Sequence, residues 1–405
     1  MTKVISSLLV LVLGVGLLSG TGGCRSRDDV ETQAPGATAP LASYQQELLD
    51  IAFGAASAMP VFPHAKNRAR AQELVVIACL ELDEPERARQ YIEQIDNWRR
   101  GTGYADLALY YARHGTVEKV EPCLDLATQA LEQAEGWRKD RIKAKMAAAR
   151  VYLGEALSAA EQGVAPAEWG PVMRAEAMTS RADAFETQMA NLEKLVSVQD
   201  FDVAKGALGV YAELYRRFFP DRTRRTRVEE KIEASWGSMP VFVRIELLME
   251  LIDAALTHTD PDKALELIDE AQALMDAARW QPRFVIPLMA RLAERRFHAG
   301  DEAGARAEVQ KALALFDAQR EKIVNIYRAQ TLRPIAEAVH AMGDGETAVN
   351  LYRRVLEAGQ ENPNSRPRTD DLVATCCSLA LHAVQPGEIL MKRIRDIRAG
   401  LGDPW

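Results

Sequence analysis

Two stretches of the chain decide its fold: residues 292–313 read LAERRFHAGDEAGARAEVQKAL, and residues 335–356 read IAEAVHAMGDGETAVNLYRRVL. Apolar residues, a glycine–aspartate pair and a following alanine fall at matching places in both, 43 residues apart. Further copies begin near residues 104 and 251, so the repeat has a period of about 40–44 residues. Internal repeats of this length indicate stacked supersecondary units.

Each unit is expected to be a helix, a tight turn and a second helix, because apolar residues recur at helical spacing on both sides of the turn. Gly300 and Gly343 stand where a first helix ends, since glycine accepts the left-handed C-cap conformation. Asp301 and Asp344 then suit the N-cap of the next helix. The residues expected at close helix crossings are Ala293, Ala305, Ala336 and Ala348. One pair cannot bury its apolar face alone, so the prediction is an all-α solenoid of stacked helix–turn–helix pairs.

This pattern resembles the tetratricopeptide repeat family. The resemblance is carried by residues 101–134, 286–319 and 329–362, more weakly by 245–278 and 68–97, and faintly by 372–398. The period is longer than the roughly 34 residues of that family, which predicts longer second helices. In the family, polar residues of the first helices line a concave groove that holds an extended peptide or a helix.

The resemblance therefore implies a groove that binds a protein partner. The matching positions are Glu294, His298, Arg333, Glu337 and His340. Glu294 and Glu337 are both expected to be exposed on this groove. A metal ladder of histidines is not expected, because successive histidines occupy different helical registers and a 100° step per residue separates their faces.

The N-terminus resembles the signal of a bacterial lipoprotein. A short start containing Lys3 precedes the apolar run Val4–Leu18, and small residues lead to Cys24. The resemblance implies removal of residues 1–23, acylation of Cys24 and attachment to a membrane of the cell envelope, facing the periplasm. Arg25 replaces the aspartate that favours the inner membrane, so the outer membrane is expected. An ordinary cleaved signal and an uncleaved anchor helix are the alternatives.

Composition divides the rest of the chain. Residues 24–42 are polar and rich in Pro, Ala and Gly, which predicts a flexible tether. Trp169-Gly170-Pro171 interrupts the repeats. The expected parts are N-terminal repeats over 43–162, an irregular helical connecting region over 163–238 and C-terminal repeats over 239–405.

Charge and motif content limit the functions. The formal charge of −8 and the pI near 5.5 argue against a nucleic-acid partner. No metal, phosphate-loop or nucleophile motif is present, so neither a cofactor nor catalysis is expected. Cys79, Cys123 and Cys376 fall on apolar helical faces as small core residues. A Cys79–Cys123 bridge in an oxidising compartment is the alternative for that pair.

A basic segment has two interpretations. Its arginines are Arg216, Arg217, Arg222, Arg224, Arg225 and Arg227. They could contact anionic lipid headgroups or an acidic partner. In the favoured interpretation a helix ends near Phe219, Asp221 starts the next helix, and the arginines pair with acidic residues at 229, 230 and 233.

The leading hypothesis is a lipid-anchored scaffold or assembly factor that binds an unidentified protein and does no catalysis. One alternative is a ligand- or sugar-binding protein or an enzyme with its site in residues 163–235, where Trp169 and Trp236 would serve as platforms. A purely structural envelope protein is the other.

Overall fold

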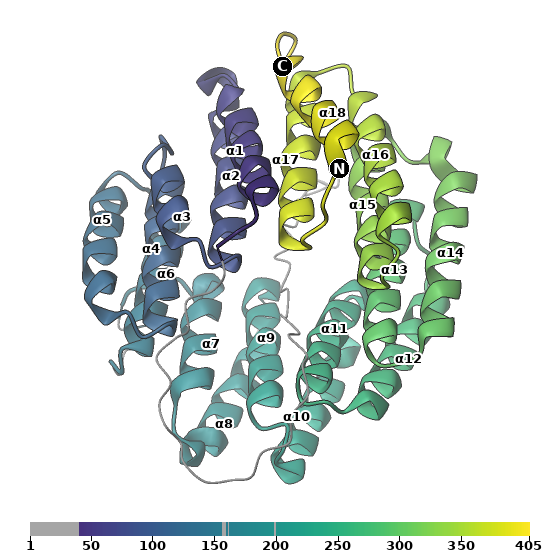
Figure 1. Cartoon of the computed structure of the whole chain (residues 1–405). Helices are drawn as coiled ribbons and strands as arrows, with labels where there is room; N and C mark the ends of the chain where they lie inside the picture. The colour runs from purple at the N-terminus through teal and green to yellow at the C-terminus, as the bar shows by residue number, and fades with distance from the viewer. Residues whose placement is uncertain (1–39, 156–158, 161, 198–199) are drawn as a thin grey trace, which may run out of the picture. The chain divides into compact units, whose positions relative to one another are not determined.

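The computed structural model describes residues 40–155, 159–160, 162–197 and 200–405, which form eighteen α-helices and no strand (Figure 1). This confirms the all-α prediction. The described helices belong to one compact unit, Thr38–Trp405. None of them is both long enough and apolar enough to cross a membrane. Cys24, the expected lipidation site, lies outside the described residues.

The first half of the chain contains α1 (Ser43–Ala58), α2 (Val61–Glu81), α3 (Pro85–Ile92), α4 (Arg99–Arg113), α5 (Val120–Glu132), α6 (Trp137–Tyr152), α7 (Gly170–Thr179) and α8 (Phe185–Val196). The second half contains α9 (Phe201–Arg217), α10 (Arg222–Ser235), α11 (Val241–Thr257), α12 (Pro261–Ala277), α13 (Pro282–His298), α14 (Glu302–Gln319), α15 (Asn325–Ala341), α16 (Gly345–Gln360), α17 (Ser365–Leu381) and α18 (Gly387–Ala399).

The repeat is most regular in the second half of the chain. The first helices α9, α11, α13, α15 and α17 are each 17 residues long and begin at residues 201, 241, 282, 325 and 365. The period is therefore 40–43 residues, close to the expected value. The expectation of an irregular region over 163–238 is wrong for its second half, because α9 and α10 form a repeat in the same register as those that follow.

The turns follow the chemistry expected of them. Gly300 and Gly343 have φ angles of 92° and 82°, in the left-handed region that favours glycine. Asp301 accepts a hydrogen bond from the Gly304 N–H at 2.9 Å, and Asp344 accepts one from the Thr347 N–H at 3.1 Å. The aspartates that start α10 and α12 cap in the same way. The start of each of these second helices is thus fixed locally.

Small buried residues allow the helices of each pair to approach closely. Ala293 and Ala336 on first helices, and Ala305 and Ala348 on second helices, are fully buried, as expected. In contrast, Ala314 and Ala318 on α14 are exposed. The second helices α12, α14 and α16 run for 16–18 residues.

The two ends of the array pack against each other. The main partner of α17 is α1, and α17 contacts its sequence neighbour α18 only lightly (Figure 1). The Gln45 side chain donates a buried hydrogen bond to the Ala380 carbonyl at 2.8 Å, and the Tyr44 hydroxyl donates to the Ala383 carbonyl at 3.0 Å. The start of α1 therefore lies at the end of α17, where a second helix belongs. This explains why the repeat is faint over 372–398.

The first helices consequently form a closed circuit. Each packs against the next from α2 through α4, α6, α7, α9, α11, α13 and α15 to α17, and α17 packs against α2. Terminal repeats of an open solenoid expose an apolar face that needs a polar cap. Here α1 and α2 cover that face of α17, so Leu379 and Cys376 are fully buried.

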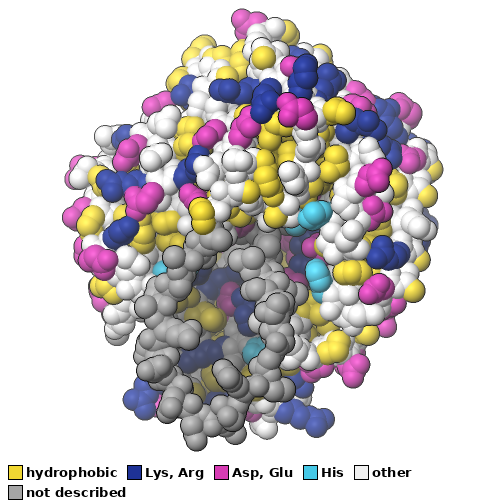
Figure 2. Space-filling model, in the orientation of Figure 1, with side chains coloured by type: hydrophobic (Ala, Val, Ile, Leu, Met, Phe, Trp, Pro, Cys, Tyr) yellow, Lys and Arg dark blue, Asp and Glu magenta, His cyan; other side chains and the backbone are white. Residues whose placement is uncertain are grey.

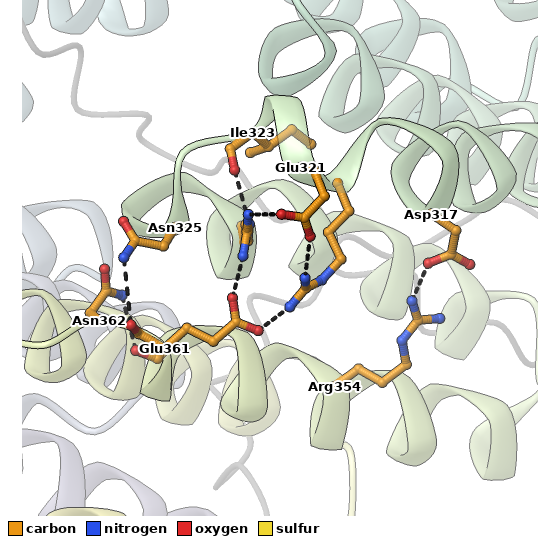
Figure 3. A network of polar contacts seen from close by, with 10 residues as sticks. Asp317, Glu321, Ile323, Asn325, Arg354, Glu361 and Asn362 are labelled. Atoms are coloured by element: carbon orange, nitrogen blue, oxygen red, sulfur yellow. Dashed lines mark hydrogen bonds and ion pairs between the residues drawn. The ribbon is translucent and has the colours of Figure 1, made fainter.

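Charged networks join neighbouring repeats on the outside of the array. Arg320 and Arg328 each contact both Glu321 and Glu361 (Figure 3). Arg328 also donates to the Ile323 carbonyl at 2.9 Å. These residues bring the end of α14, the start of α15 and the end of α16 together. The four ionic side chains alternate in sign around a closed loop, which holds the repeats in register.

Candidate binding surface of the first helices

An acidic residue recurs at one place in the repeat. The thirteenth residue of α9, α11, α13 and α15 is Glu213, Asp253, Glu294 and Glu337, and we call these four residues the acidic row. In α17 the thirteenth residue is Cys377, which is buried. A carboxylate kept in four successive helices places negative charge along one line that crosses the repeats.

A member of the acidic row can pair with a residue of the next first helix. Whether it does depends on the side chain at the fourteenth place of that next helix. Arg295, at this place in α13, donates to Asp253 at 2.7 Å, and Ser378, at this place in α17, donates to Glu337 at 2.5 Å. The corresponding residues Ala254 and Ala338 carry no donor. Glu213 pairs within its own helix with Arg216 at 3.1 Å. Glu294 has no hydrogen bond or ion pair with any described residue.

Glu337 is not the exposed groove residue that the sequence predicted. Its side chain is 5% exposed and forms an ion pair with Arg333 at 3.3 Å. Ser378, which hydrogen-bonds Glu337, also contacts the Tyr352 hydroxyl at 2.7 Å. Burial raises the pKa of Tyr352 well above its ordinary value, and Glu337 acts in the same direction. Glu337 can be buried because Arg333 and Ser378 supply partners for its carboxylate.

The other predicted groove residues lie on accessible stripes of two neighbouring helices. On α13, Glu294 is half-buried and His298, one turn further, is exposed. On α15, Arg333 and His340 are half-buried and spaced by seven residues, which places them on one helical face. Burial lowers the pKa of His340, and neighbouring His382 lowers it further. The structure thus brings Arg333 together with Glu337, whereas His298 has no contact with either.

A second set of charges on the first helices was not anticipated from the sequence. Lys205 on α9 faces Glu246 on α11 at 3.7 Å. Arg174 on α7 crosses Gly209 of α9 and reaches Glu250 on α11 at 3.8 Å. A Cβ at position 209 would lie 2.0 Å from the Arg174 guanidinium, so glycine opens this path. Burial raises the pKa values of Glu246 and Glu250, and these cationic partners counteract the rise.

Arg291, on α13, is the cation of this set without a partner. Its guanidinium has no hydrogen bond or ion pair with any described residue, although the residue is half-buried. Burial lowers the pKa of its guanidinium, and Arg295 one turn away lowers it further. Glu246 and Asp253 act in the opposite direction but are committed to Lys205 and Arg295. A poorly solvated guanidinium with five unused donors is suited to a carboxylate or phosphate acceptor.

Arg291 and Glu294 therefore form a pair of free charges of opposite sign on one face of α13. They are three residues apart, which places them on the same side of the helix. Figure 2 shows acidic, basic and histidine side chains on the viewed face of the molecule. Arg291 could have been found from the repeat pattern in the sequence. It is the tenth residue of α13, and Glu250, 41 residues earlier, is the tenth residue of α11.

The basic segment is mostly a paired surface. Helix α9 ends at Arg217 and Asp221 caps α10, as expected. The expected ion pairs to residues 229, 230 and 233 are wrong. The observed contacts are Arg216 with Glu213, Arg217 with the Ala177 and Ser180 carbonyls, Arg224 with Asp221, and Arg227 with Glu186. Arg222 and Arg225 instead line a surface cavity.

The tryptophans proposed as platforms for a ligand point into the protein's own structure. Trp169 donates its indole N–H to the Val164 carbonyl at 2.8 Å and packs on the small cluster around α6 and α7. Trp236 contacts Glu270 at 3.3 Å. The cysteines within the described residues are free and buried, so Cys79 and Cys123 are not bridged. No group of three or more potential metal ligands occurs among the described residues.

No family model matches the chain, and no curated protein matches it. A solved structure described as a "Circular tandem repeat protein with novel repeat topology and enhanced subunit contact surfaces" is similar at 15% sequence identity with a TM-score of 0.29. The match covers 88% of this chain and 94% of that chain. The repeat fold described above rests on this chain's own helices and their contacts.

Proposed function

We propose that this chain is a lipid-anchored binding scaffold of the bacterial cell envelope, with tetratricopeptide-like repeats that hold a protein partner on their first helices. In this proposal, Cys24 carries the acyl chains and residues 24–42 tether the repeats to a membrane, with the outer membrane as the expected location. The chain does no catalysis in this account. Several acyl chains together make such an attachment lasting.

The observation that carries the proposal is the free pair Arg291 and Glu294. The carboxylates that act on Arg291, namely Glu246, Asp253 and Glu337, each have an ion-pair partner of their own. An unpaired and poorly solvated charge costs free energy of folding. A single substitution would remove that charge. A partner that presents a carboxylate to Arg291 and an ammonium or guanidinium to Glu294 would satisfy both groups.

One acidic and one basic side chain, three or four residues apart on a partner helix, would match this pair, because residues at that spacing share one helical face. The acidic row extends the surface, since Glu213 and Asp253 continue the line of carboxylates from Glu294, although each of them has an ion-pair partner. A solenoid gains affinity by spreading contacts over successive repeats. The supported partner is therefore a protein segment of mixed charge that spans α9 to α15.

Site-specific photo-cross-linking in intact cells tests the proposal. A photoreactive amino acid placed at position 294 should give a discrete adduct with a second protein. The matched control carries the same residue at position 318, where an exposed alanine on the second helix α14 lies away from the first-helix surface. An adduct at 294 alone supports the binding surface. Adducts at both positions, or at 318 alone, would place the partner elsewhere.

A further inference from the structure

The second helix α10 departs from the packing rule of its neighbours at one residue. In α12, α14 and α16, the fourth residue after the capping aspartate is a fully buried alanine: Ala264, Ala305 and Ala348. In α10 the residue four after Asp221 is Arg225, and its side chain is 20% exposed. Places where a repeat breaks its own packing rule are candidates for function.

A surface cavity of about 480 Å³ lies beside Arg225, between the turn that precedes α10 and the turn that precedes α12. Its walls include Arg222 and Arg225 from α10, Asp260 and Asp262 from the next turn, and the rings of Phe219 and His258. The cavity is thus formed by the corresponding turns of two successive repeats. It lies apart from the first-helix surface that carries Arg291.

Aromatic contacts fix the position of Arg225. The rings of Phe219 and His258 stack with centroids 4.8 Å apart and an interplanar angle of 3°. The Arg225 guanidinium carbon lies 4.5 Å from the centroid of the Phe219 ring, within cation–π range. His258 Nε2 is 2.8 Å from the Arg216 carbonyl oxygen, which holds the imidazole in place. Arg225 is therefore presented to the cavity on a rigid support.

The cations of the cavity have unused hydrogen-bond donors. Arg225 uses Nη1 both for its hydrogen bond to the Phe219 carbonyl at 3.3 Å and for its contact with Asp260 at 3.8 Å, so its Nη2 has no partner among the described residues. The exposed side chain of Arg222 has no hydrogen bond or ion pair with any described residue.

The carboxylates balance these two cations. One oxygen of Asp260 is used to cap α12 through the Lys263 N–H at 3.0 Å. Asp262 has no partner among the described residues and is exposed. A ligand that satisfies all four groups must carry both signs of charge.

We propose that this cavity binds a zwitterionic phosphate ester that carries an amine, of the phosphoethanolamine type, with its phosphate on Arg222 and Arg225 and its ammonium toward Asp262 and Asp260. A phosphate is favoured over a carboxylate because its several oxygens can accept from two guanidinium groups at once. A simple anion is disfavoured, because the two aspartates would repel it. The ligand could be a free metabolite or the headgroup of a phospholipid.

Isothermal titration calorimetry on the full-length protein, with O-phosphoethanolamine as the probe, tests this assignment. Inorganic phosphate and ethanolamine, titrated separately, should each bind at least tenfold more weakly than the combined molecule. Arg225→Ala restores the alanine of the neighbouring repeats, so the variant should fold normally, as circular dichroism would show. It should weaken phosphoethanolamine binding at least tenfold, and Asp262→Asn should also weaken it.

The matched control is Arg306→Ala, which removes an arginine of α14 that contacts the Met342 carbonyl and lies outside the cavity. It should leave binding unchanged. Vesicles with and without phosphatidylethanolamine, probed with a Cys24→Ser variant, distinguish a headgroup from a free ligand. No binding of phosphoethanolamine, equal binding of inorganic phosphate, or equal binding by wild type and Arg225→Ala would each overturn the proposal.

Discussion

Arg295 on α13 donates to Asp253 on α11 at 2.7 Å, which joins the fourteenth residue of one first helix to the thirteenth residue of the one before it. Ser378 and Glu337 repeat this relationship between α17 and α15. For Glu294, on the helix between these two pairs, the corresponding fourteenth residue is Ala338, which has no side-chain donor. The same repeat position is therefore structural in two helices and free in the helix between them.

This difference predicts unequal effects on stability. Asp253→Asn leaves Arg295, whose side chain is 12% exposed, without its ionic partner. Removing one member of such a partly buried pair should lower the free energy of unfolding by about 1–3 kcal/mol. Glu294→Gln changes the same position one repeat later and should alter the free energy of unfolding by less than about 0.5 kcal/mol. Urea unfolding of both variants measures the difference, and equal losses would contradict the assignment.

The packing of α1 on α17 predicts that the ends of the array do not fray. Backbone amides of α1 should exchange hydrogen about as slowly as those of α13, because opening α1 exposes the apolar face of α17. Gln45→Ala removes the buried hydrogen bond to Ala380 and should destabilise the whole unit by about 1 kcal/mol. Gln310→Ala, at an exposed position on α14, serves as the control. Exchange from α1 that is orders of magnitude faster than from α13 would show an open end.

The stability of the fold should depend on pH through Glu81. Burial raises the pKa of this carboxyl from 4.5 to about 7. Because the folded-state pKa lies above the unfolded one, the folded chain binds the extra proton more tightly, and stability falls as the pH rises from about 4.5 through about 7. Glu81→Gln should flatten this fall, which is of the order of 1–3 kcal/mol. Melting temperatures between pH 5 and pH 8 measure it, with the exposed Glu357→Gln as control.

The proposed anchor gives a prediction for cell fractions. Cys24→Ser should move the protein from the membrane to the soluble fraction, because no described helix can span a membrane. Fractionation followed by high-salt and carbonate washes provides the measurement. Variant protein that stays with the membrane after both washes would show that residues other than Cys24 hold it there.

The sequence predicted the features that depend on nearby residues. The turn at Gly300-Asp301, its copy at Gly343-Asp344 and the four crossing alanines are local, because capping and close approach are decided within one pair of helices. Their spacing was sufficient to identify the all-α repeat. The end of α9 and the start of α10 were predicted, but their place in the regular repeat was missed because the interruption around Trp169-Gly170-Pro171 hides the register.

The features that depend on distant residues were not predicted. Gln45 and Ala380 are 335 residues apart, and no local pattern indicates that α1 completes the repeat of α17. The burial of Glu337 depends on its hydrogen bond with Ser378 of α17, which in turn contacts Tyr352 of α16. The resemblance to a groove-forming family placed Glu294 on the accessible surface, and the structure adds Arg291 beside it. Ion pairs between repeats can be identified only when the first helices are aligned residue by residue.

The central claim is that Arg291 and Glu294 contact the protein partner, and the affinity of that partner for charge-reversed variants tests it most directly. The partner cross-linked at position 294 would be purified and titrated against wild type, Arg291→Glu and Glu294→Lys, with circular dichroism to check folding. Each single reversal should weaken binding at least tenfold and change its salt dependence, because it places like charges opposite each other. Affinities that stay within twofold of wild type for both correctly folded variants would contradict the account.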